Sequence, residues 1–512
     1  MTAWGILLGL VALCTLSWTE ALHFTPETAN DTLRSVYDYI IVGGGTAGLT
    51  IANRLSENSS VSVLVLEAGP LDDARNLTIP KGLLPVPGSE RFNANAYKED
   101  ANALRIHPDL SMHGSNGSVH VSYPRYFYTQ SINVLDGFLE LGIPIIDDPN
   151  NGTAAGAMLL PSSMHPTNQT RFDAREAHFN PADRRSNLHV ATGQTVTRLI
   201  LEPFNLLTGT RRVVGVEFAE DEKAKKRMVV CKREVIVSAG AIFSPTLLQV
   251  SGIGPAKILE SLDVPVEIDL PGVGYNLQDH PMIYATYYCP WTAPLINTVA
   301  FPSLKSVTDS WKDFVDDKSS GEAVPDDAPR SVKIGYETQK EILREQVLSN
   351  DMGIFETMAN SWGQLTVAAQ KTFSRGTVRP STSSIFDPPL LDPRYCSDPI
   401  DCEIIVLGLQ LNMKLIETKA MKELMPQPYT AFNTTDHEKL MREVLRGLTT
   451  ERHPSGTVAM MPRDMGGVVD PELRVYGTCN LRVADASIMP LIPSAHLQAV
   501  VYAIAEKVSF GH

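Results

Sequence analysis

The order of apolar and polar residues predicts a strand, a helix and a second strand early in the chain. Apolar residues dominate positions 37–42, and a cluster of glycines follows at 43–48. Apolar positions then recur with helical spacing over 49–55, and a second apolar run over 61–66 ends at Glu67. This succession is typical of a βαβ unit.

Further apolar patterns predict short strands in the middle of the chain and helices later on. The expected strands are residues 188–192, 196–201, 212–217 and 228–237, and the expected helices are residues 402–425 and 436–448. Dense glycine, strand and helix patterns return in the last 60 residues. Because the strongest patterns lie at both ends, we expect one discontinuous domain with a second domain inserted into it.

A short apolar run at the N-terminus, residues 4–16, predicts a signal peptide. The run is too short for a bilayer, which needs roughly 20 apolar residues, and Ala21 offers a small residue at the cleavage point. A buried N-terminal helix is the alternative. No later segment has the pattern of a membrane span, so none is expected. Seven Asn-x-Ser/Thr sites for glycosylation favour a secreted protein or one in a vesicular lumen: Asn30, Asn58, Asn76, Asn116, Asn151, Asn168 and Asn433.

Charge and cysteine content narrow the class of protein. The 512 residues include 44 Lys and Arg against 58 Asp and Glu, a net charge of -14, so a nucleic-acid partner is not expected. Of six cysteines, Cys14 would leave with the signal peptide, and the five that remain cannot all pair with one another. Cys396 and Cys402 are the disulfide candidate, and buried free thiols are the alternative.

The glycine cluster has the spacing G-x-G-x-x-G of a dinucleotide site. It consists of Gly43, Gly45, Thr46, Ala47 and Gly48 together with Gly44. The first glycine permits a tight turn, the second lets a pyrophosphate approach the backbone, and the third lets the helix pack on the strand. Glu67 lies 19 residues after Gly48, where its carboxylate can accept hydrogen bonds from a ribose. The spacing predicts dinucleotide binding and does not separate FAD from NAD.

Longer motifs carry a resemblance to a known family. They are Gly-Ala-Ile-Phe-Ser-Pro-Thr-Leu-Leu-Gln at 240–249, Pro-Gly-Val-Gly-Tyr-Asn-Leu-Gln-Asp-His-Pro at 271–281, His-Pro-Ser-Gly-Thr at 453–457, Gly-Gly-Val-Val-Asp-Pro at 466–471, Asn-Leu-Arg-Val-Ala-Asp-Ala-Ser at 480–487 and Ser-Ala-His-Leu-Gln at 494–498. In this order they resemble the glucose–methanol–choline (GMC) oxidoreductases, which include aryl-alcohol oxidase and glucose oxidase. The resemblance runs from about Tyr37 to the C-terminus.

The resemblance implies an α/β fold: a doubly wound, Rossmann-like FAD-binding domain with an inserted α+β substrate domain built on an antiparallel sheet. The expected division is a signal peptide (1–21), FAD-binding parts (36–88, 185–278 and 446–512), a connecting segment that belongs partly to the substrate domain (89–184) and the substrate domain itself (279–445).

The resemblance also implies site residues. The implied FAD contacts are Gly43, Gly45, Thr46, Ala47, Gly48, Glu67, Val196, Asp485, Ala486, Leu497 and Gln498. The implied catalytic pair is His453 and His496. A neutral imidazole is a suitable base for a hydroxyl proton, and a second can stabilise the developing alkoxide. We assign His453 as the base and His496 as its partner, although the two roles could be exchanged. His280 is interpreted as a structural, hydrogen-bonding histidine.

One family segment is missing from this chain. GMC proteins carry a flavin-covering segment with a Gly-Gly-Ser-Ser-x-x-Asn stretch, and no such stretch occurs between Pro80 and Glu90 or elsewhere. Roughly 80 to 90 residues are absent, more than a change in loop length accounts for. Three explanations are open: an exon lost from the coding sequence, a degenerate relative that binds flavin poorly, or coverage of the flavin by residues 80–110.

The expected function is FAD-dependent oxidation of a small-molecule alcohol, with oxygen or a quinone as electron acceptor. An aryl alcohol or a secondary metabolite is the expected substrate class. Two alternatives stay open: a GMC-fold lyase or cyclase without net redox chemistry, and an inactive secreted relative. The sequence does not indicate an oligomeric state.

Overall fold

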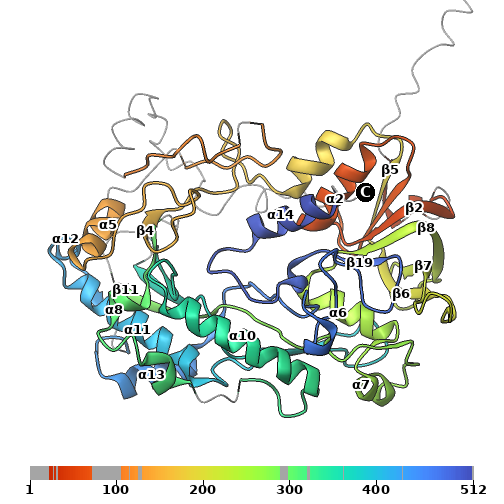
Figure 1. The fold of residues 1–512 in the computed structure, drawn as a ribbon. Helices are drawn as coiled ribbons and strands as arrows, with labels where there is room; N and C mark the ends of the chain where they lie inside the picture. Colours follow the sequence, from red (N-terminus) through yellow and green to blue (C-terminus); the bar gives the residue numbers. More distant parts are fainter. Residues whose placement is uncertain are drawn as a thin grey trace, which may run out of the picture.

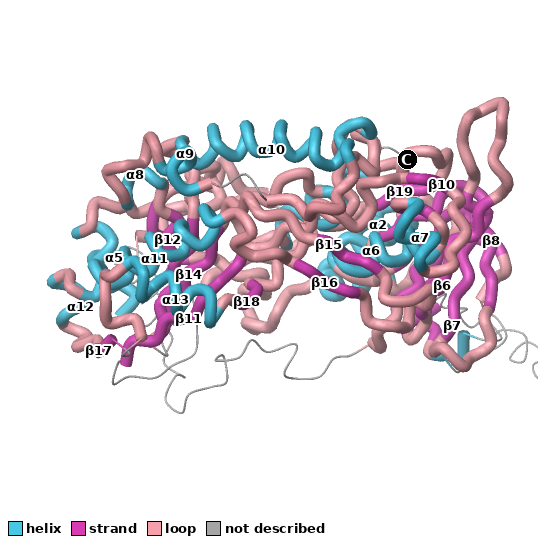
Figure 2. Tube along the Cα trace, turned by 90° about the horizontal axis from the view of Figure 1, so that it is seen from below, coloured by secondary structure: helices cyan, strands magenta, loops and turns pink. Residues whose placement is uncertain are grey.

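The structure is a computed structural model in which two sheets lie at opposite ends of an elongated molecule (Figures 1 and 2). It describes residues 22–26, 28–29, 33–71, 105–114, 116–124, 130–288, 298–319, 323–360, 363–428 and 431–509. The predicted signal peptide lies outside these residues, as do the candidate sites Asn30 and Asn76. Asn58, Asn116, Asn168 and Asn433 are exposed and Asn151 is half-buried, so glycosylation at these five stays a prediction.

The first sheet is mainly parallel and draws its strands from distant parts of the chain. Within the described residues its order is β1-β5-β3-β2-β8-β7-β6, with β19 paired to β8. All neighbours from β1 to β8 are parallel, and β8, β7 and β6 form an antiparallel meander. The bounds are β1 (Leu22–Phe24), β2 (Val36–Val42), β3 (Val63–Glu67), β5 (Leu188–Thr192), β6 (Thr195–Leu201), β7 (Val213–Ala219), β8 (Arg227–Val237) and β19 (Leu481–Val483).

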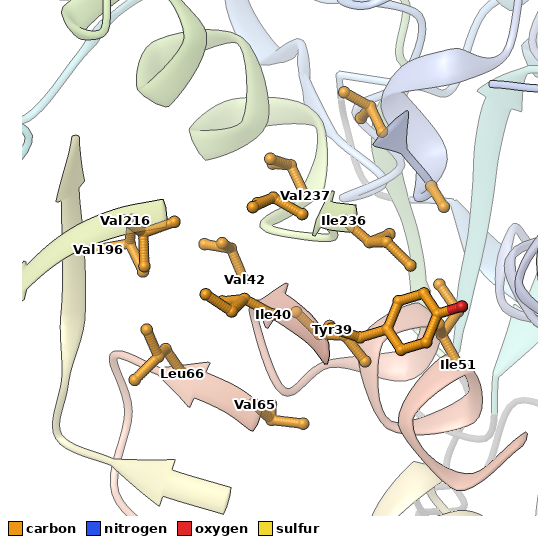
Figure 3. Packing of buried hydrophobic residues seen from close by; sticks show 14 of the residues in the cluster. Tyr39, Ile40, Val42, Ile51, Val65, Leu66, Val196, Val216, Ile236 and Val237 are labelled. Atoms are coloured by element: carbon orange, nitrogen blue, oxygen red, sulfur yellow. The ribbon is translucent and has the colours of Figure 1, made fainter. Parts of the chain in front are cut away.

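Apolar side chains fill both faces of this sheet, as expected for parallel strands covered on both sides. Ile40, Val65 and Val237 are fully buried in the cluster of Figure 3. Helix α2 (Thr46–Ser56) packs against α14 (Gln498–Ser509). An ion pair between Arg54 and Glu506, 2.7 Å long, joins these helices. The start and the end of the chain therefore form one unit, which confirms the predicted doubly wound architecture.

The second sheet is antiparallel. Within the described part of the chain its order is β17-β11-β14-β13-β12-β4, with β18 paired to β11. Helix α11 (Pro399–Ile416) packs against β11, β13 and β14 and buries an apolar face there. The bounds are β4 (Gly156–Leu159), β11 (Pro281–Tyr288), β12 (Thr298–Phe301), β13 (Phe355–Asn360), β14 (Gln364–Ala369), β17 (Gln427–Pro428) and β18 (Thr449–Thr450). The predicted antiparallel sheet of the second domain is therefore confirmed, whereas the predicted domain boundaries stay a prediction.

Shorter elements complete the described fold. They are α5 (Gln130–Glu140), η1 (Arg175–Phe179), η2 (Asn180–Ala182), α6 (Gly240–Val250), β9 (Ile253–Gly254), α7 (Ala256–Ser261), β10 (Ile268–Asp269), α8 (Leu304–Val307), α9 (Phe314–Lys318), α10 (Arg330–Leu348), β15 (Thr377–Arg379), β16 (Leu390–Asp392), α12 (Lys419–Lys422), α13 (His437–Gly447), η3 (Arg463–Met465) and η4 (Ala486–Ile488).

One predicted helix is divided in the structure. The sequence predicts a single helix over 402–425, but α11 ends at Ile416 and α12 begins at Lys419. The Thr418 hydroxyl accepts a hydrogen bond from the amide of Met421 and so caps a new helix. The helix predicted at 436–448 is α13, which the Asp436 carboxylate caps at its N-terminus.

Two features bear on the predicted cellular location. A disulfide joins Cys396 to Cys402. Cys231 and Cys479 are free, and Cys289 lies outside the described residues. Among the helices of the described ranges, none has the length and apolar character that crossing a bilayer requires.

Candidate functional site: a cluster of imidazoles and carboxylates

Two segments from distant parts of the chain pair next to the antiparallel sheet. The amides and carbonyls of Gln278 and Ser455 exchange hydrogen bonds of 3.0 and 2.9 Å. Further along, Pro281 of β11 pairs with Thr450 of β18. The motif at 271–281 is thereby held alongside the motif at 453–457, which places His280 beside His453.

The Asp279 carboxylate fixes the backbone of this junction. It accepts hydrogen bonds from the amide of His453 at 2.9 Å and from the amide of His280 at 2.8 Å. The hydroxyl of Tyr395 donates to it at 2.5 Å, and so does the hydroxyl of Thr450. By accepting these hydrogen bonds, the Asp279 carboxylate holds the backbone of both histidines in place.

Three imidazoles follow one another through the site. Nδ1 of His280 lies 3.0 Å from Nδ1 of His453, and the two ring centroids are 5.2 Å apart. The rings of His453 and His496 have centroids 5.4 Å apart. His280 is fully buried, the side chain of His453 is 17% exposed and that of His496 is 48% exposed. Of the three, His453 and His496 are therefore the ones that a small molecule can reach.

Two buried glutamates contact these rings. Nε2 of His496 lies 3.2 Å from both carboxylate oxygens of Glu356 and 3.6 Å from Oε1 of Glu451. Oε2 of Glu451 lies 3.2 Å from Nδ1 of His280 and 3.6 Å from Nδ1 of His453. The Gln370 amide donates to both carboxylates, at 3.1 Å to Glu451 and 3.4 Å to Glu356. The five ionisable side chains therefore form one network.

Burial and mutual contact shift the proton affinities of the network. Burial raises the pKa of Glu356 to about 7, because His496 only partly offsets the loss of water. Burial alone would raise the pKa of Glu451 as well. Hydrogen bonds from His280 and His453 outweigh the effect of burial and hold the pKa of Glu451 well below its usual range. Burial lowers the pKa of His280, which therefore stays neutral.

His496 behaves in the opposite way. Burial alone would lower its pKa, but the hydrogen bond and the charge of Glu356 outweigh that and raise the pKa to about 9. At neutral pH His496 is therefore an imidazolium, and both of its ring nitrogens carry protons. Nε2 faces the glutamates, so Nδ1 is the nitrogen left to donate a hydrogen bond to an anionic or developing anionic oxygen.

The glycine cluster has the geometry that a dinucleotide requires. Gly43 has φ +103°, which favours glycine, and a Cβ on Gly48 would lie 1.9 Å from the carbonyl oxygen of Gly43. A Cβ on Gly45 would meet no atom within 4 Å, so the space in front of the N-terminus of α2 is open. The Glu67 carboxylate accepts from the amides of Gly44 at 2.6 Å and Gly69 at 2.7 Å, and each oxygen keeps a free lone pair. These residues fit the pyrophosphate and ribose of a dinucleotide.

The other predicted cofactor contacts have varied surroundings. The side chain of Val196 is buried in the apolar core shown in Figure 3. The Asp485 carboxylate accepts from the amide of Gly240 at 2.9 Å and from the hydroxyl of Ser244 at 2.6 Å, which gives it a structural task. Ala486 begins η4, Leu497 is buried, and Gln498 is exposed at the start of α14. Their contacts with FAD stay a prediction.

Sequence reasoning missed part of the cluster. It did not single out Glu356, Glu451 or Gln370. His280, interpreted as structural and hydrogen-bonding, is fully buried, with its Nδ1 3.0 Å from Nδ1 of His453. One signal was available for Glu356: it is a lone acid in the strand pattern of β13, where a charge is costly unless it is paired. Glu451 stands two residues before His453 and offers no pattern of its own.

A Rossmann-like nucleotide site together with an accessible imidazole pair is typical of the cofactor-dependent oxidoreductases. Comparisons with known proteins define the family. Two family models described as GMC oxidoreductase match residues 88–282 and 372–505, and an NAD(P)-binding Rossmann-like domain matches residues 41–71. The dehydrogenase xptC of Emericella nidulans is 30% identical, over 96% of this chain and 95% of that protein. The GMC oxidoreductase family protein Mala s 12 of Malassezia sympodialis is 29% identical, over 99% and 98%.

Solved structures agree with this assignment. An FAD-dependent oxidoreductase from Chaetomium thermophilum has a TM-score of 0.85 at 27% identity and covers 93% of this chain and 98% of that one. A fungal aryl-alcohol oxidase has a TM-score of 0.80 at 26% identity, with 93% and 99% covered. The chain belongs to the GMC oxidoreductase family, and its cofactor is FAD.

The alignment with the Emericella dehydrogenase also bears on the missing segment. It spans 598 positions, and this chain has 512 residues, so at least 86 aligned positions have no residue here. That number has the size expected from the absent flavin-covering segment. The expected gap between Pro80 and Glu90 falls within residues 72–104, which lie outside the described residues.

Proposed function

We propose that this chain oxidises a primary or secondary alcohol to a carbonyl compound, with His453 as the base and His496 as its partner. The observation that carries the proposal is the pairing of the two accessible imidazoles, with ring centroids 5.4 Å apart, beside the carboxylates of Glu356 and Glu451. FAD, when bound, accepts the hydride from the alcohol carbon. The glycine cluster and Glu67 would hold its pyrophosphate and ribose.

The two histidines have distinct tasks in this proposal. Nδ1 of His453 faces His280 and Glu451, so its Nε2 is the nitrogen that accepts the hydroxyl proton. His496, which is an imidazolium because Glu356 raises its pKa to about 9, donates a hydrogen bond to the substrate oxygen. That bond strengthens as alkoxide charge develops, so it stabilises the transition state more than the bound alcohol.

The proposed substrate is an aryl alcohol or a hydroxylated secondary metabolite. Similarity to a fungal aryl-alcohol oxidase over 93% of the chain supports an aromatic substrate. The proposed acceptor is oxygen or a quinone, and the proposed location is the secretory pathway or the exterior. Oxygen uptake with peroxide formation, compared with reduction of an added quinone, distinguishes the two acceptors.

Anaerobic mixing of the purified, FAD-loaded protein with a panel of aryl alcohols tests the function. We expect loss of the visible absorbance of oxidised flavin and one equivalent of aldehyde or ketone per flavin. Conversion of an added substrate without loss of flavin absorbance would instead indicate a lyase or cyclase. A protein that retains no FAD under saturating cofactor would identify the chain as an inactive relative and would refute the proposal.

A further inference from the structure

One oxygen of Glu451 is the meeting point of three nitrogen atoms. Oε2 lies 3.1 Å from Nε2 of Gln370, 3.2 Å from Nδ1 of His280 and 3.6 Å from Nδ1 of His453. The Gln370 amide is a donor in this arrangement. Each neutral imidazole carries its proton on either Nδ1 or Nε2. The contacts of His280 and His453 determine which of the two nitrogens is protonated.

The surroundings of His280 decide its tautomer. Nε2 of His280 is buried and has no hydrogen-bond partner among the described residues. A proton on that nitrogen would be a buried donor without an acceptor, and the Nδ1 lone pair would face the carboxylate. With the proton on Nδ1, His280 donates a hydrogen bond to Glu451, and Nε2 is no longer a buried donor without an acceptor.

The same carboxylate acts on His453. If Nδ1 of His453 lacked a proton, it would accept a hydrogen bond from Nδ1–H of His280 at 3.0 Å. That proton would then turn away from the charged Glu451 oxygen, which is 3.2 Å from the same nitrogen, and the lone pair of His453 would face the carboxylate. A proton on Nδ1 turns the contact with the carboxylate into an attraction. The 3.0 Å approach of the two Nδ1 atoms then reflects two donors that converge on one charged oxygen.

We propose that Glu451 is a positioning residue that fixes both His280 and His453 as Nδ1–H tautomers and so leaves Nε2 of His453 as the proton acceptor. The consequence for catalysis rests on the proposed function, whereas the tautomers themselves do not. The carboxylate acts through the ring of His453, as an orienting group does in other imidazole-based sites, and need not touch the substrate.

The other charged groups around Glu451 are compatible with this role. His496 approaches Oε1 from the C-terminal segment at 3.6 Å, and Glu356 of β13 shares the Gln370 amide with Glu451. Asp279 accepts hydrogen bonds from the backbone amides of both histidines. Hydrogen bonds from His280 and His453 keep the pKa of Glu451 low, so it stays an acceptor throughout the neutral range.

The tautomers can be read directly in the FAD-loaded protein labelled with ¹⁵N-histidine. Long-range ¹H–¹⁵N spectra distinguish a protonated from an unprotonated ring nitrogen, and His280→Asn and His453→Asn assign the signals. We expect Nδ1 protonated and Nε2 unprotonated for both rings in the unsubstituted protein. A proton on Nε2 of His453 at neutral pH would overturn the proposal, whether or not the protein oxidises alcohols.

A charge-neutral substitution separates positioning from packing. Glu451→Gln keeps the size of the side chain, and Glu451→Asp keeps the charge. We expect Glu451→Gln to lose the Nδ1–H signal of His453 and to slow anaerobic flavin reduction by roughly 100-fold. Glu451→Asp should retain the signal and most of the rate. Unchanged tautomers and an unchanged rate of flavin reduction in Glu451→Gln would contradict the proposal.

The experiments distinguish failure of the positioning role of Glu451 from failure of the proposed function. If the unsubstituted protein reduces no flavin with any alcohol but shows both Nδ1–H tautomers, the function fails and the positioning role stands. If Glu451→Gln does not fold, the spectra of the unsubstituted protein and of Glu451→Asp still decide the tautomers. Glu417→Gln, which removes an exposed carboxylate paired with Lys422 at 2.9 Å, is the matched control and should change neither readout.

Discussion

Nδ1 of His280 lies 3.0 Å from Nδ1 of His453, and the planes of the two rings are nearly perpendicular, at 88°. The residues are 173 positions apart in the chain, and the pairing of Gln278 with Ser455 brings them together. A histidine that the sequence presents as structural therefore contacts the proposed base. The backbone pairing next to Asp279 therefore also sets the contact between the two imidazoles.

Removal of the Glu356 charge should change the behaviour of the enzyme at high pH. Glu356 raises the pKa of His496 from its ordinary value of 6.5 to about 9, so His496 keeps its proton until the pH approaches 9. In Glu356→Gln this support is lost, and His496 deprotonates at a lower pH. We expect the alkaline limb of kcat/KM to move to lower pH by about one unit or more. Glu417→Gln is the control, and an alkaline limb that does not move would show that His496 need not be protonated.

Two glycines of the nucleotide site should respond differently to alanine. In Gly45→Ala the new methyl group meets no protein atom within 4 Å but occupies the space that a pyrophosphate needs. We expect this variant to fold with an unchanged melting temperature as the apoprotein and to bind FAD at least about tenfold more weakly.

Gly48→Ala is the companion variant. Its methyl group would lie 1.9 Å from the carbonyl oxygen of Gly43, and backbone cannot move aside cheaply. We therefore expect loss of folded protein, measured by circular dichroism and by solubility, as well as loss of FAD. Equal FAD affinity in Gly45→Ala and the unsubstituted protein would contradict the predicted position of the cofactor.

The disulfide should stabilise the antiparallel domain. Cys396 and Cys402 are six residues apart, and Cys402 lies in the first turns of α11, which packs on that sheet. Replacement of both by serine should lower the free energy of unfolding by about 2 kcal/mol, the loop-closure value for so short a loop. Denaturant unfolding measures this, and Cys479→Ser, which removes an exposed free thiol, should have no effect. A double variant as stable as the parent would show that the bridge contributes nothing.

The sequence predicts the nucleotide-binding half of the fold well. The glycine spacing and the apolar runs of β2 and β3 are local signals, and each strand predicted between 188 and 237 is present in the structure. The division between α11 and α12 is less visible, because the Thr418 cap interrupts a stretch whose apolar pattern continues. The hydrogen bond from the Met421 amide to the Thr418 hydroxyl ends one helix and starts another, although the local sequence favours a continuous helix.

The site is only half predictable. The motifs that carry His453 and His496 identify the pair, but the partners come from elsewhere in the chain: Glu356 precedes His496 by 140 residues. Contacts of this kind depend on how the antiparallel sheet packs against the C-terminal segment. A local sequence pattern does not predict that packing. The protonation of Glu356, Glu451 and His496 follows from burial and from their mutual contacts, neither of which the sequence shows.

Anaerobic flavin reduction in the unsubstituted protein and in His453→Gln tests the central claim most directly. With a saturating aryl alcohol in a stopped-flow instrument, the unsubstituted protein should reduce its flavin. His453→Gln should retain FAD and react roughly 100-fold to 10,000-fold more slowly, because no base accepts the hydroxyl proton. His437→Gln, an exposed histidine of α13, should react at the normal rate. Flavin reduction in His453→Gln at the rate of the unsubstituted protein would contradict the account.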